Sequence, residues 1–387
     1  SHFSHRLAIV GSTAEDMQSQ LSAFEADAAA SAHGVIKNGG RPKLVFLFTG
    51  QGSQYAQMGK QLYDSEPVFR NVIDRCAELL DTHLDIPLCD VMYDADNGRL
   101  DQTAYTMPTL FTIEVALAEL WRSWGIEPDA VMGHSVGEFA AAYVAGVLRL
   151  EDALTLVAGR AALLQSLPAG GGMAAVLCNR ATCEDALAPW DGGLCVAAEN
   201  GPQLTIISGE LSALEEAMTA LNDEHGIRTQ SLNVSHAFHS ARVDPILDDL
   251  KKLAETVVHS PPKIPFMANV TGEWFCDTSR PDPAYWRRQA REPVKFESGI
   301  RACADAGYGV FLEIGPKPTL APMAQRILAG SSNGDAIAFL SSINRDHDHR
   351  TMLDAMAQLH VRGFRIDWDA VYARQPQQLV DLPSYPF

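Results

Sequence analysis

The sequence has no hydrophobic run long enough to cross a membrane. A membrane-spanning helix needs about 20 consecutive apolar residues, and no segment of the 387 residues approaches that length. The first residues are polar and lack the apolar centre of a signal peptide. We therefore expect no association with a membrane.

Cysteines in the spacing of a redox or metal site are also missing. The chain has seven scattered cysteines, none in a C-x-x-C motif: Cys76, Cys89, Cys178, Cys183, Cys195, Cys276 and Cys303. An odd number without paired spacing argues against a disulfide framework and a zinc site. The cluster Asp346-His347-Asp348-His349 resembles a metal site, but a polar turn explains it better. We expect no bound metal and a reducing cytoplasm.

Positive charge is scarce. Lysine and arginine number 30 against 48 aspartates and glutamates, which gives a net charge of -18. This excess makes nucleic acid an improbable partner. An acidic protein partner would need a local basic patch, and Arg287, Arg288 and Arg291 offer one candidate. A solvated helix face is the alternative explanation of these arginines.

The order of apolar segments predicts a parallel α/β core over residues 41–172 and 236–335. Leu44–Phe48 is a continuous apolar run, typical of a strand that is covered on both faces. Further strands are expected at 130–132, 264–270 and 310–314, and helices at 61–81, 108–124, 138–145 and 151–166. Strands that alternate with helices indicate this architecture.

Residues 173–235 break this rhythm. Strands are expected at 173–178, 194–198, 204–208 and 227–234, with helices at 181–189 and 211–221. The order β-α-β-β-α-β is that of a ferredoxin-like unit, here inserted between two parts of the core. Strand 7–10 and helix 14–30 precede the core, a strand and a helix lie within 336–372, and 380–387 is expected to be extended.

The segment Gly133-His134-Ser135-Val136-Gly137 carries the clearest chemical signal. It fits a nucleophile elbow, G-x-S-x-G, in which a serine sits on a strained turn between a strand and a helix. The apolar residues before it and the helical pattern after it supply that context. The sequence therefore predicts that Ser135 is a nucleophile.

A serine hydroxyl needs a base, and histidine is the usual one because its pKa lies near neutrality. His134 adjoins the serine, but neighbours on a tight turn point apart, so a structural role is favoured. His236 and His239 are better placed, because they follow the insert where the chain re-enters the core. A structural or solvated role remains the alternative for each histidine.

The oxyanion formed during attack needs hydrogen-bond donors. The elbow itself supplies the N–H group of Val136. The loop Thr49–Gln54 follows the first core strand, and its glycines would let Gln51 approach as a second donor. Such a donor is worth ~3–4 kcal/mol of transition-state stabilisation. A dinucleotide-binding loop is the rival interpretation, but Tyr55 stands where the third glycine of G-x-G-x-x-G belongs.

Arg160 interrupts an apolar helix face. It lies four residues after Leu156 and four before Leu164, so the three share one side of the predicted helix. A buried arginine without a partner costs ~3–5 kcal/mol. An internal Asp or Glu partner, or a side chain that reaches water, would explain it structurally. The functional alternative is a fork that binds a substrate carboxylate.

Taken together, these residues resemble the malonyl-CoA:acyl-carrier-protein transacylases, and more closely the acyltransferase domains of modular polyketide synthases. Gly50–Gln54 match the family's G-Q-G-S-Q, and Gly133–Glu138 match G-H-S-x-G-E. The resemblance implies that Arg160, 25 residues after the serine, binds a carboxylate and that His239 is the base. It also implies that a main-chain carbonyl, that of Asn269, orients His239.

The resemblance extends to both ends of the chain. Residues 5–10 resemble the linker between ketosynthase and acyltransferase, which assigns 1–40 to that linker. Residues 381–387 resemble the segment after the acyltransferase, so 336–387 would form the C-terminal linker and tail. The implied fold class is α/β, with an α/β-hydrolase-like core, the ferredoxin-like subdomain and a small α+β linker subdomain. One departure is Met107, where many relatives carry glutamine.

The motif His236-Ala237-Phe238-His239 is typical of malonyl-selective members, whereas methylmalonyl-selective members typically carry Tyr-Ala-Ser-His. Phe238 would fill the space that an α-methyl group needs, with His236 and Val136 as further specificity residues. One methyl group gives only ~1–3 kcal/mol of discrimination.

The resemblance implies a ping-pong acyltransferase that moves malonyl from malonyl-CoA to Ser135 and then to the phosphopantetheine of an acyl carrier protein. Its partners would be that carrier protein and a flanking ketosynthase, with no bound cofactor. A serine esterase or thioesterase, and a docking domain with a decayed site, are the alternatives.

Overall fold

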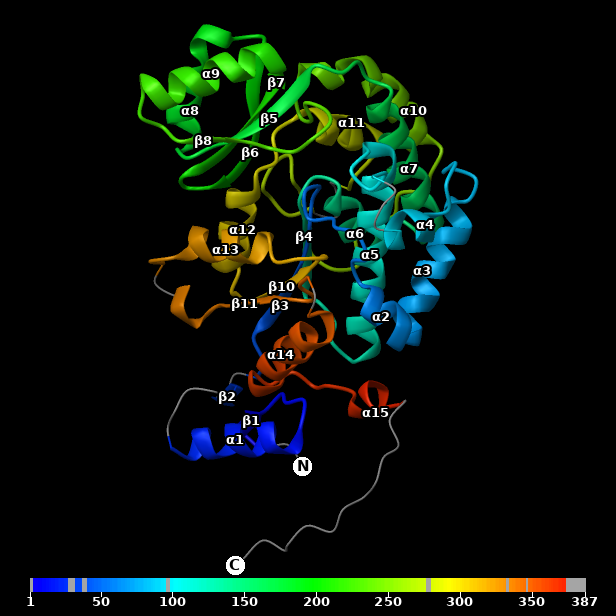
Figure 1. The fold of residues 1–387 in the computed structure, drawn as a ribbon, viewed down its shortest axis with the longest axis vertical. Coiled ribbons are helices and arrows are strands. Elements are labelled where there is room, and N and C mark those ends of the chain that lie inside the picture. The colour runs from blue at the N-terminus through cyan, green and yellow to red at the C-terminus, as the bar shows by residue number, and fades with distance from the viewer. Residues whose placement is uncertain are drawn as a thin grey trace, which may run out of the picture.

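A five-stranded parallel sheet forms the centre of the computed structural model (Figure 1). The structure describes residues 3–26, 32–36, 40–94, 98–275, 280–331, 334–345 and 347–373. The strands run in the order β11-β10-β3-β4-β9, and every neighbouring pair is parallel. Their bounds are β3 Lys43–Phe48, β4 Ala130–Gly133, β9 Phe266–Met267, β10 Tyr308–Ile314 and β11 Ala338–Ser341.

Helices cover both faces of this sheet. Helices α12 (Phe296–Asp305) and α13 (Leu320–Leu328) lie to its left in Figure 1. The larger group lies to its right and comprises α2 Lys60–Ser65, α3 Pro67–Leu80, α4 Leu88–Tyr93, α5 Thr103–Ser123, α6 Gly137–Val144, α7 Leu150–Gln165, α10 Leu247–Glu255 and α11 Pro283–Arg291. Because both faces are covered, Leu44–Phe48 of β3 are completely buried, as the apolar run predicts.

A second, antiparallel sheet forms the insert, at the top of Figure 1. Its elements are β5 Gly171–Val176, α8 Arg180–Leu187, η1 Ala188–Trp190, β6 Leu194–Gly201, β7 Leu204–Glu210, α9 Leu211–Asp223 and β8 Thr229–Ser231. The order β6-β7-β5-β8 is that of a ferredoxin-like unit. The unit has a small apolar core of its own beneath α8 and α9. The predicted insert is therefore confirmed.

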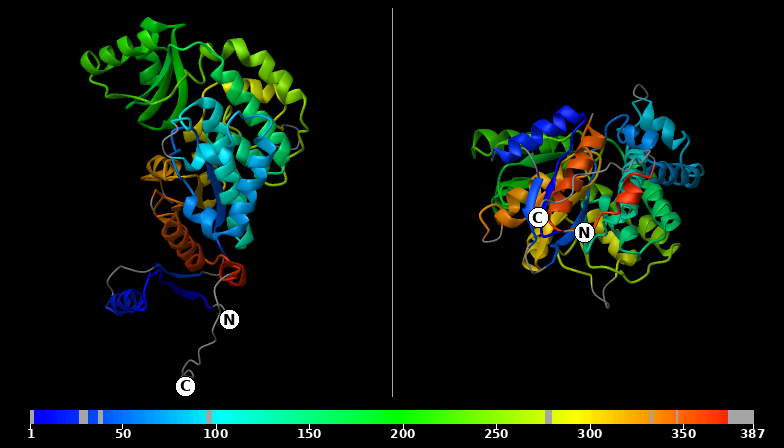
Figure 2. Two further views of the ribbon diagram at one scale, coloured as in Figure 1. Left: turned by 45° about the vertical axis from the view of Figure 1, so that its right-hand side comes forward. Right: turned by 90° about the horizontal axis from the view of Figure 1, so that it is seen from below.

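A small α+β unit lies at the opposite end of the molecule (Figure 2). It contains β1 His5–Ala8, α1 Ala14–Glu25, β2 Ala32–Val35 and α14 Asp348–Val361, and α15 Trp368–Val371 follows. Strands β1 and β2 pair antiparallel, and Arg6 donates to the carbonyl of His360 at 2.9 Å. Residues near the two ends of the chain thus pack together, as the implied linker subdomain requires.

Several expected elements differ in extent. The helix expected at 61–81 is two helices, because Pro67 begins α3 after Glu66 adopts an extended conformation. Helix α5 starts one turn before the expected position and carries Pro108 inside it. The strand expected at 264–270 shortens to β9. The unpredicted elements include β2, α4, α10, α12 and α13. The expected extended segment 380–387 lies outside the described residues.

The 3₁₀ helices are η1, η2 (Ala241–Ile246) and η3 (Gly334–Ala336). Across the described ranges, no helix combines the length and the apolar character that a membrane crossing requires.

Candidate active site

Ser135 lies on the tight turn between β4 and α6. Its φ is +52°, in the left-handed region that non-glycine residues rarely adopt. A Cβ at Gly133 would lie 2.2 Å from the backbone nitrogen of Glu138, and one at Gly137 would lie 2.3 Å from the carbonyl oxygen of Thr49. Both flanking glycines are therefore required by close backbone approach, and the predicted elbow is present.

The hydroxyl of Ser135 lies within hydrogen-bond distance of the imidazole of His239. The distance from Oγ to Nε2 is 2.8 Å, and Nδ1 of His239 lies 2.9 Å from the carbonyl oxygen of Glu292. A carbonyl can only accept, so Nδ1 carries the proton and Nε2 keeps a lone pair for the serine proton. The pair is thus arranged as a nucleophile and its base.

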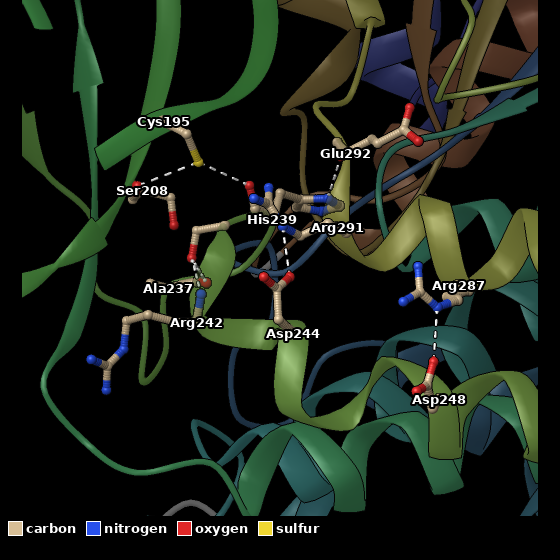
Figure 3. A network of polar contacts seen from close by, with 11 residues as sticks. Cys195, Ser208, Ala237, His239, Arg242, Asp244, Asp248, Arg287, Arg291 and Glu292 are labelled. Atoms are coloured by element: carbon tan, nitrogen blue, oxygen red, sulfur yellow. Dashed lines mark hydrogen bonds and ion pairs between the residues drawn. The ribbon is translucent and has the colours of Figure 1, made fainter. Parts of the chain in front are cut away.

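Local hydrogen bonds fix the loop that carries His239, which itself has a φ of +55°. Ser240 Oγ donates to the carbonyl of Ala237 at 2.7 Å and accepts from the N–H of Arg242 at 3.2 Å. On the other side, the thiol of Cys195 lies 3.3 Å from the carbonyl oxygen of His239 (Figure 3). The insert therefore helps to hold the base.

Asn269 does not orient His239, so this expectation is wrong. Its carbonyl accepts from the N–H of Lys295 at 2.9 Å, and the carbonyl beside the imidazole belongs to Glu292. The reason is geometric: Asn269 follows β9, which pairs with β4, so its side chain faces the elbow. The loop after α11 is the segment that passes His239 (Figure 3).

Burial keeps His239 neutral. The side chain is 3% exposed. Loss of hydration, followed by the nearby positive charge of Arg160, lowers the pKa of His239 to about 3. At neutral pH the imidazole is therefore unprotonated, the form that can accept a proton.

Arg160 is 1% exposed on α7, as its place on the apolar face predicts. Its Nη1 donates to Oε1 of Gln289 at 2.5 Å, and its guanidinium lies 5.3 Å from the centre of the Phe139 ring. Its buried Nε has no hydrogen-bond partner among the residues that the structure describes. Within the part of the chain that the structure describes, no ion pair of Arg160 occurs. The charge of buried Glu138 acts on Arg160, but the two side chains form no ion pair within 4.0 Å, so the guanidinium can still receive an anion.

Gln289 links this arginine to the nucleophile. Its Nε2 donates to the carbonyl of Ser135 at 2.8 Å while its Oε1 accepts from Arg160. Sequence reasoning missed Gln289, although a signal existed. With Tyr285, Trp286 and Ala290 it forms the buried face of α11, and a polar residue on such a face needs a partner.

The two expected oxyanion donors lie beside the elbow. Val136 is 1% exposed and immediately precedes α6. The loop that carries Gln51 touches the elbow, since a Cβ at Gly50 would lie 3.0 Å from the carbonyl oxygen of His134. The structure thus brings Gln51, Val136 and Ser135 to one end of the sheet.

His236 and Phe238 lie in the same loop as the base. They are 7% and 6% exposed, and their ring centres are 6.1 Å apart. His236 Nδ1 lies 2.9 Å from Ser235 Oγ, which in turn lies 2.7 Å from the hydroxyl of Thr103. The motif is therefore packed against α5, not exposed to solvent.

Two further predictions concern a histidine and three arginines outside this set. His134 Nε2 lies 2.8 Å from Asn200, in keeping with a structural role. Arg287, Arg288 and Arg291 pair with Asp248, Glu292 and Asp244 at 3.2, 2.7 and 2.8 Å, respectively. Figure 3 shows the pairs of Arg287 and Arg291. Their charges are locally balanced, which favours a solvated helix face over a basic patch.

The segment Asp346-His347-Asp348-His349, which resembles a metal site, places His349 in a structural contact. His349 Nε2 lies 2.7 Å from the hydroxyl of Ser65 on α2, and Asp346 lies outside the described residues. No group of three or more His, Cys, Asp or Glu side chains in the described ranges could hold a metal ion.

The elbow serine, the neutral imidazole and the buried guanidinium thus lie together in a protein of the α/β class. The family model for the acyl transferase domain matches residues 45–366. The chain belongs to this family, and its relatives are acyltransferase domains of modular polyketide synthases.

Individual relatives support this assignment. The chain is 39% identical over 389 residues to erythronolide synthase EryA2 of Saccharopolyspora erythraea, with 99% of the chain and 11% of that protein covered. The acyltransferase domain from the second module of the salinomycin polyketide synthase superposes with a TM-score of 0.89 at 39% identity, covering 98% of this chain and 88% of that one.

A more distant structure is the malonyl CoA-acyl carrier protein transacylase of Clostridium perfringens. It has a TM-score of 0.74 at 29% identity and covers 82% of this chain and 97% of that one. The chain spans only 5 to 18% of the length of three curated synthases that it matches, so it corresponds to one part of such proteins.

Proposed function

We propose that this domain loads a malonyl unit from malonyl-CoA onto Ser135 and passes it to the phosphopantetheine thiol of an acyl carrier protein. The observation that carries the proposal is the 2.8 Å contact between Ser135 Oγ and His239 Nε2, next to a buried arginine that forms no ion pair among the described residues. No bound cofactor is required for this chemistry.

In the first half-reaction, Nε2 of His239 accepts the proton of Ser135 as Oγ attacks the thioester carbonyl. Negative charge then develops on the carbonyl oxygen, and the N–H of Val136 and the side chain of Gln51 are the proposed donors to it. When the C–S bond breaks, His239 returns the proton to the sulfur and CoA leaves as a thiol. The acyl group remains as an ester of Ser135.

The second half-reaction reverses these steps with a different thiol. His239 takes the proton of the pantetheine thiol, the sulfur attacks the ester, and the proton passes to Ser135 Oγ as it leaves. Because Nδ1 is bound to a fixed carbonyl, the imidazole keeps the same orientation in both halves. The carbonyl of Glu292 is therefore the proposed His-orienting group.

Arg160 is the proposed site for the carboxylate of the acyl unit. A guanidinium can donate two parallel hydrogen bonds to a carboxylate. Only one nitrogen of Arg160, Nη1, donates to Gln289. Gln289 also joins Arg160 to the backbone of Ser135, so the carboxylate site and the nucleophile form one unit.

The choice of malonyl rests on Phe238. Its ring is buried beside His239, where a serine in relatives of the other selectivity would leave room for an α-methyl group. Val136 and His236 would complete the acyl pocket. One relative, the Clostridium perfringens transacylase, is named for malonyl-CoA, which agrees with this choice.

Competitive loading tests the proposal. The domain receives equal amounts of malonyl-, methylmalonyl- and acetyl-CoA, and the intact protein is weighed before and after addition of carrier protein. We expect a malonyl adduct that moves to the carrier. A predominant methylmalonyl adduct would overturn the substrate and leave the mechanism; no adduct on the folded domain would overturn the mechanism.

A serine hydrolase is the main alternative. Hydrolases with this elbow usually orient the histidine with an acidic side chain, whereas here a main-chain carbonyl does so, which favours transfer. Release of free malonate faster than transfer to pantetheine would establish the hydrolase instead. A decayed docking domain is disfavoured by the assembled Ser135, His239 and Arg160.

The remaining proposals concern context. A neighbouring ketosynthase in the same synthase is proposed from the relatives, which are much longer multidomain proteins. The cytoplasm is the proposed location, and the six described cysteines are free thiols, in agreement with a reducing compartment.

A further inference from the structure

The side chain of Asn269 bridges the two ends of the nucleophile turn. Its Oδ1 accepts the N–H of Ser135 at 2.8 Å, and its Nδ2 donates to the carbonyl of Gly133 at 2.7 Å. Asn269 is 1% exposed, so water does not compete for these bonds. One amide therefore satisfies a donor and an acceptor that lie on either side of His134.

This bridge lies where the sheet stops. Strand β4 pairs with β9 only as far as Met132 and Met267. On its other edge, β4 continues beside β3, where His134 donates to the carbonyl of Phe48 at 2.9 Å. The Asn269 amide thus takes the place of the peptide group that β9 would have supplied next to the elbow.

The amide is itself held from behind. The N–H of Asn269 lies 2.9 Å from Oε1 of Glu138 and 3.1 Å from the hydroxyl of Tyr285, and Tyr285 donates to the same carboxylate oxygen. The main-chain carbonyl of Asn269 accepts from the N–H of Lys295. Glu138 belongs to α6, the helix that follows the nucleophile, so the contacts form a closed ring around the elbow.

The ring holds a conformation that the chain does not favour. Ser135 has a φ of +52°, and this conformation directs Oγ toward His239. A residue in this region persists only where its surroundings fix it. The two hydrogen bonds from the Asn269 side chain, to the N–H of Ser135 and the carbonyl of Gly133, fix the peptide groups on either side of this turn.

We propose that Asn269 is a positioning residue that fixes the left-handed turn of Ser135 and thereby keeps Oγ within reach of His239. The inference rests on the proposed function, because it assumes that Ser135 is the nucleophile. It assigns Asn269 a role through its side chain, distinct from the expected role of its carbonyl.

Two substitutions separate positioning from simple packing. Asn269→Ala removes both bonds. Asn269→Asp has almost the same shape, but its carboxylate can accept only from Ser135 and places an oxygen against the carbonyl of Gly133. When that carboxyl is protonated, its O–H can donate to Gly133, which restores the original pattern. Acid should therefore rescue Asn269→Asp but not Asn269→Ala.

The assay is the rate at which Ser135 becomes labelled, both by malonyl-CoA and by a fluorophosphonate probe that needs only an activated serine. A misplaced nucleophile commonly costs about 100-fold, and we expect a loss of that order in both variants at about pH 8. For Asn269→Asp we expect at least a tenfold recovery relative to wild type toward about pH 5.5, as the buried carboxyl protonates.

The comparison with wild type at each pH is essential, because other groups titrate nearby. Glu138 and Tyr285 contact the backbone of Asn269, and His239 contacts Ser135. All three are present in every protein, so their effects cancel in the ratio of rates.

Asn222→Asp is the matched control. Asn222 on α9 also bridges one residue through both ends of its amide, accepting from the N–H of Thr229 at 3.1 Å and donating to its hydroxyl at 2.8 Å. It belongs to the insert and does not touch the elbow. We expect Asn222→Asp to label at the wild-type rate at every pH.

The outcomes are distinguishable. Wild-type labelling rates in folded Asn269→Ala, or a rate for Asn269→Asp that does not recover in acid, would overturn the positioning role and leave the proposed function intact. Absence of Ser135 labelling in the wild type would overturn the proposed function itself. If Asn269→Ala does not fold, Asn269→Asp still decides, because one folded protein is compared with itself at two pH values.

Discussion

Replacement of Arg160 by alanine should convert a malonyl-selective domain into one that no longer distinguishes malonyl from acetyl. The guanidinium is buried, has a neutral partner in Gln289 and keeps an unpartnered Nε. A bound carboxylate would supply the direct ion pair that the described residues do not provide, since Glu138 acts on Arg160 without a contact of 4.0 Å or less. Acetyl-CoA has no carboxylate, so its reaction should lose nothing from the substitution.

The magnitude follows from the bonds that are lost. A hydrogen bond to a charged group contributes about 1.5–3 kcal/mol. A two-bond fork is therefore worth about 3–6 kcal/mol, or a roughly 10²- to 10⁴-fold lower kcat/KM for malonyl-CoA. The fold should survive, because no buried carboxylate within 4.0 Å loses its counter-charge among the described residues. We expect the free energy of unfolding to change by less than about 2 kcal/mol.

The assay compares initial acylation rates of Ser135 from malonyl-CoA and acetyl-CoA in wild type and Arg160→Ala, with urea unfolding as a check. Arg160→Lys is the matched control, since it keeps the charge without the fork, and it should fall between the two. Equal losses for both thioesters would refute the reasoning, because they would show that Arg160 supports the site without binding the carboxylate.

Four other predictions follow from the same geometry. Because burial lowers the pKa of His239 to about 3, its imidazole stays unprotonated as pH falls, so a pH–rate profile of acylation should show no decline near the ordinary histidine pKa of about 6.5; half-loss at that pH would contradict it. Because the pKa of His239 is lower in the folded protein than in the unfolded chain, the unfolded chain binds a proton on this histidine at a higher pH. The stability that His239 contributes is therefore present above about pH 6.5 and declines as the pH falls toward 3. Gly137→Ala places a Cβ 2.3 Å from the carbonyl oxygen of Thr49 and should lower the free energy of unfolding by about 1–3 kcal/mol or more, and wild-type urea stability would disprove the clash. Phe238→Ser should reduce the preference for malonyl- over methylmalonyl-CoA by roughly 10-fold or more in competitive loading, whereas an unchanged ratio would place the selectivity elsewhere.

The serine, the histidine and the buried arginine of the proposed site could be predicted because each leaves a local mark. Two glycines around Ser135 mark the elbow, and Arg160 stands out as a charge on an apolar helix face. His239 needed the order of the segments, since only the return of the chain from the insert places it near the core. The same order predicted the ferredoxin-like unit.

Other parts depend on contacts that the sequence does not display. Whether Asn269 or Glu292 faces His239 is decided by where β9 stops and where the loop after α11 runs. The role of Gln289 depends on its contacts with Arg160 of α7 and with the carbonyl of Ser135, which lie far from it in the sequence. The sequence of strand β2 contains Gly34 and no clear alternation of apolar and polar residues. This segment is a strand because it pairs with β1 and packs against α14.

The most direct test of the central claim is the mass of the peptide that contains Ser135 after brief exposure to malonyl-CoA. We predict one malonyl group on that serine in wild type, none in Ser135→Ala, greatly slowed loading in His239→Ala, and loss of the group when carrier protein is added. A malonyl group on another residue, or unchanged loading without His239, would contradict the account.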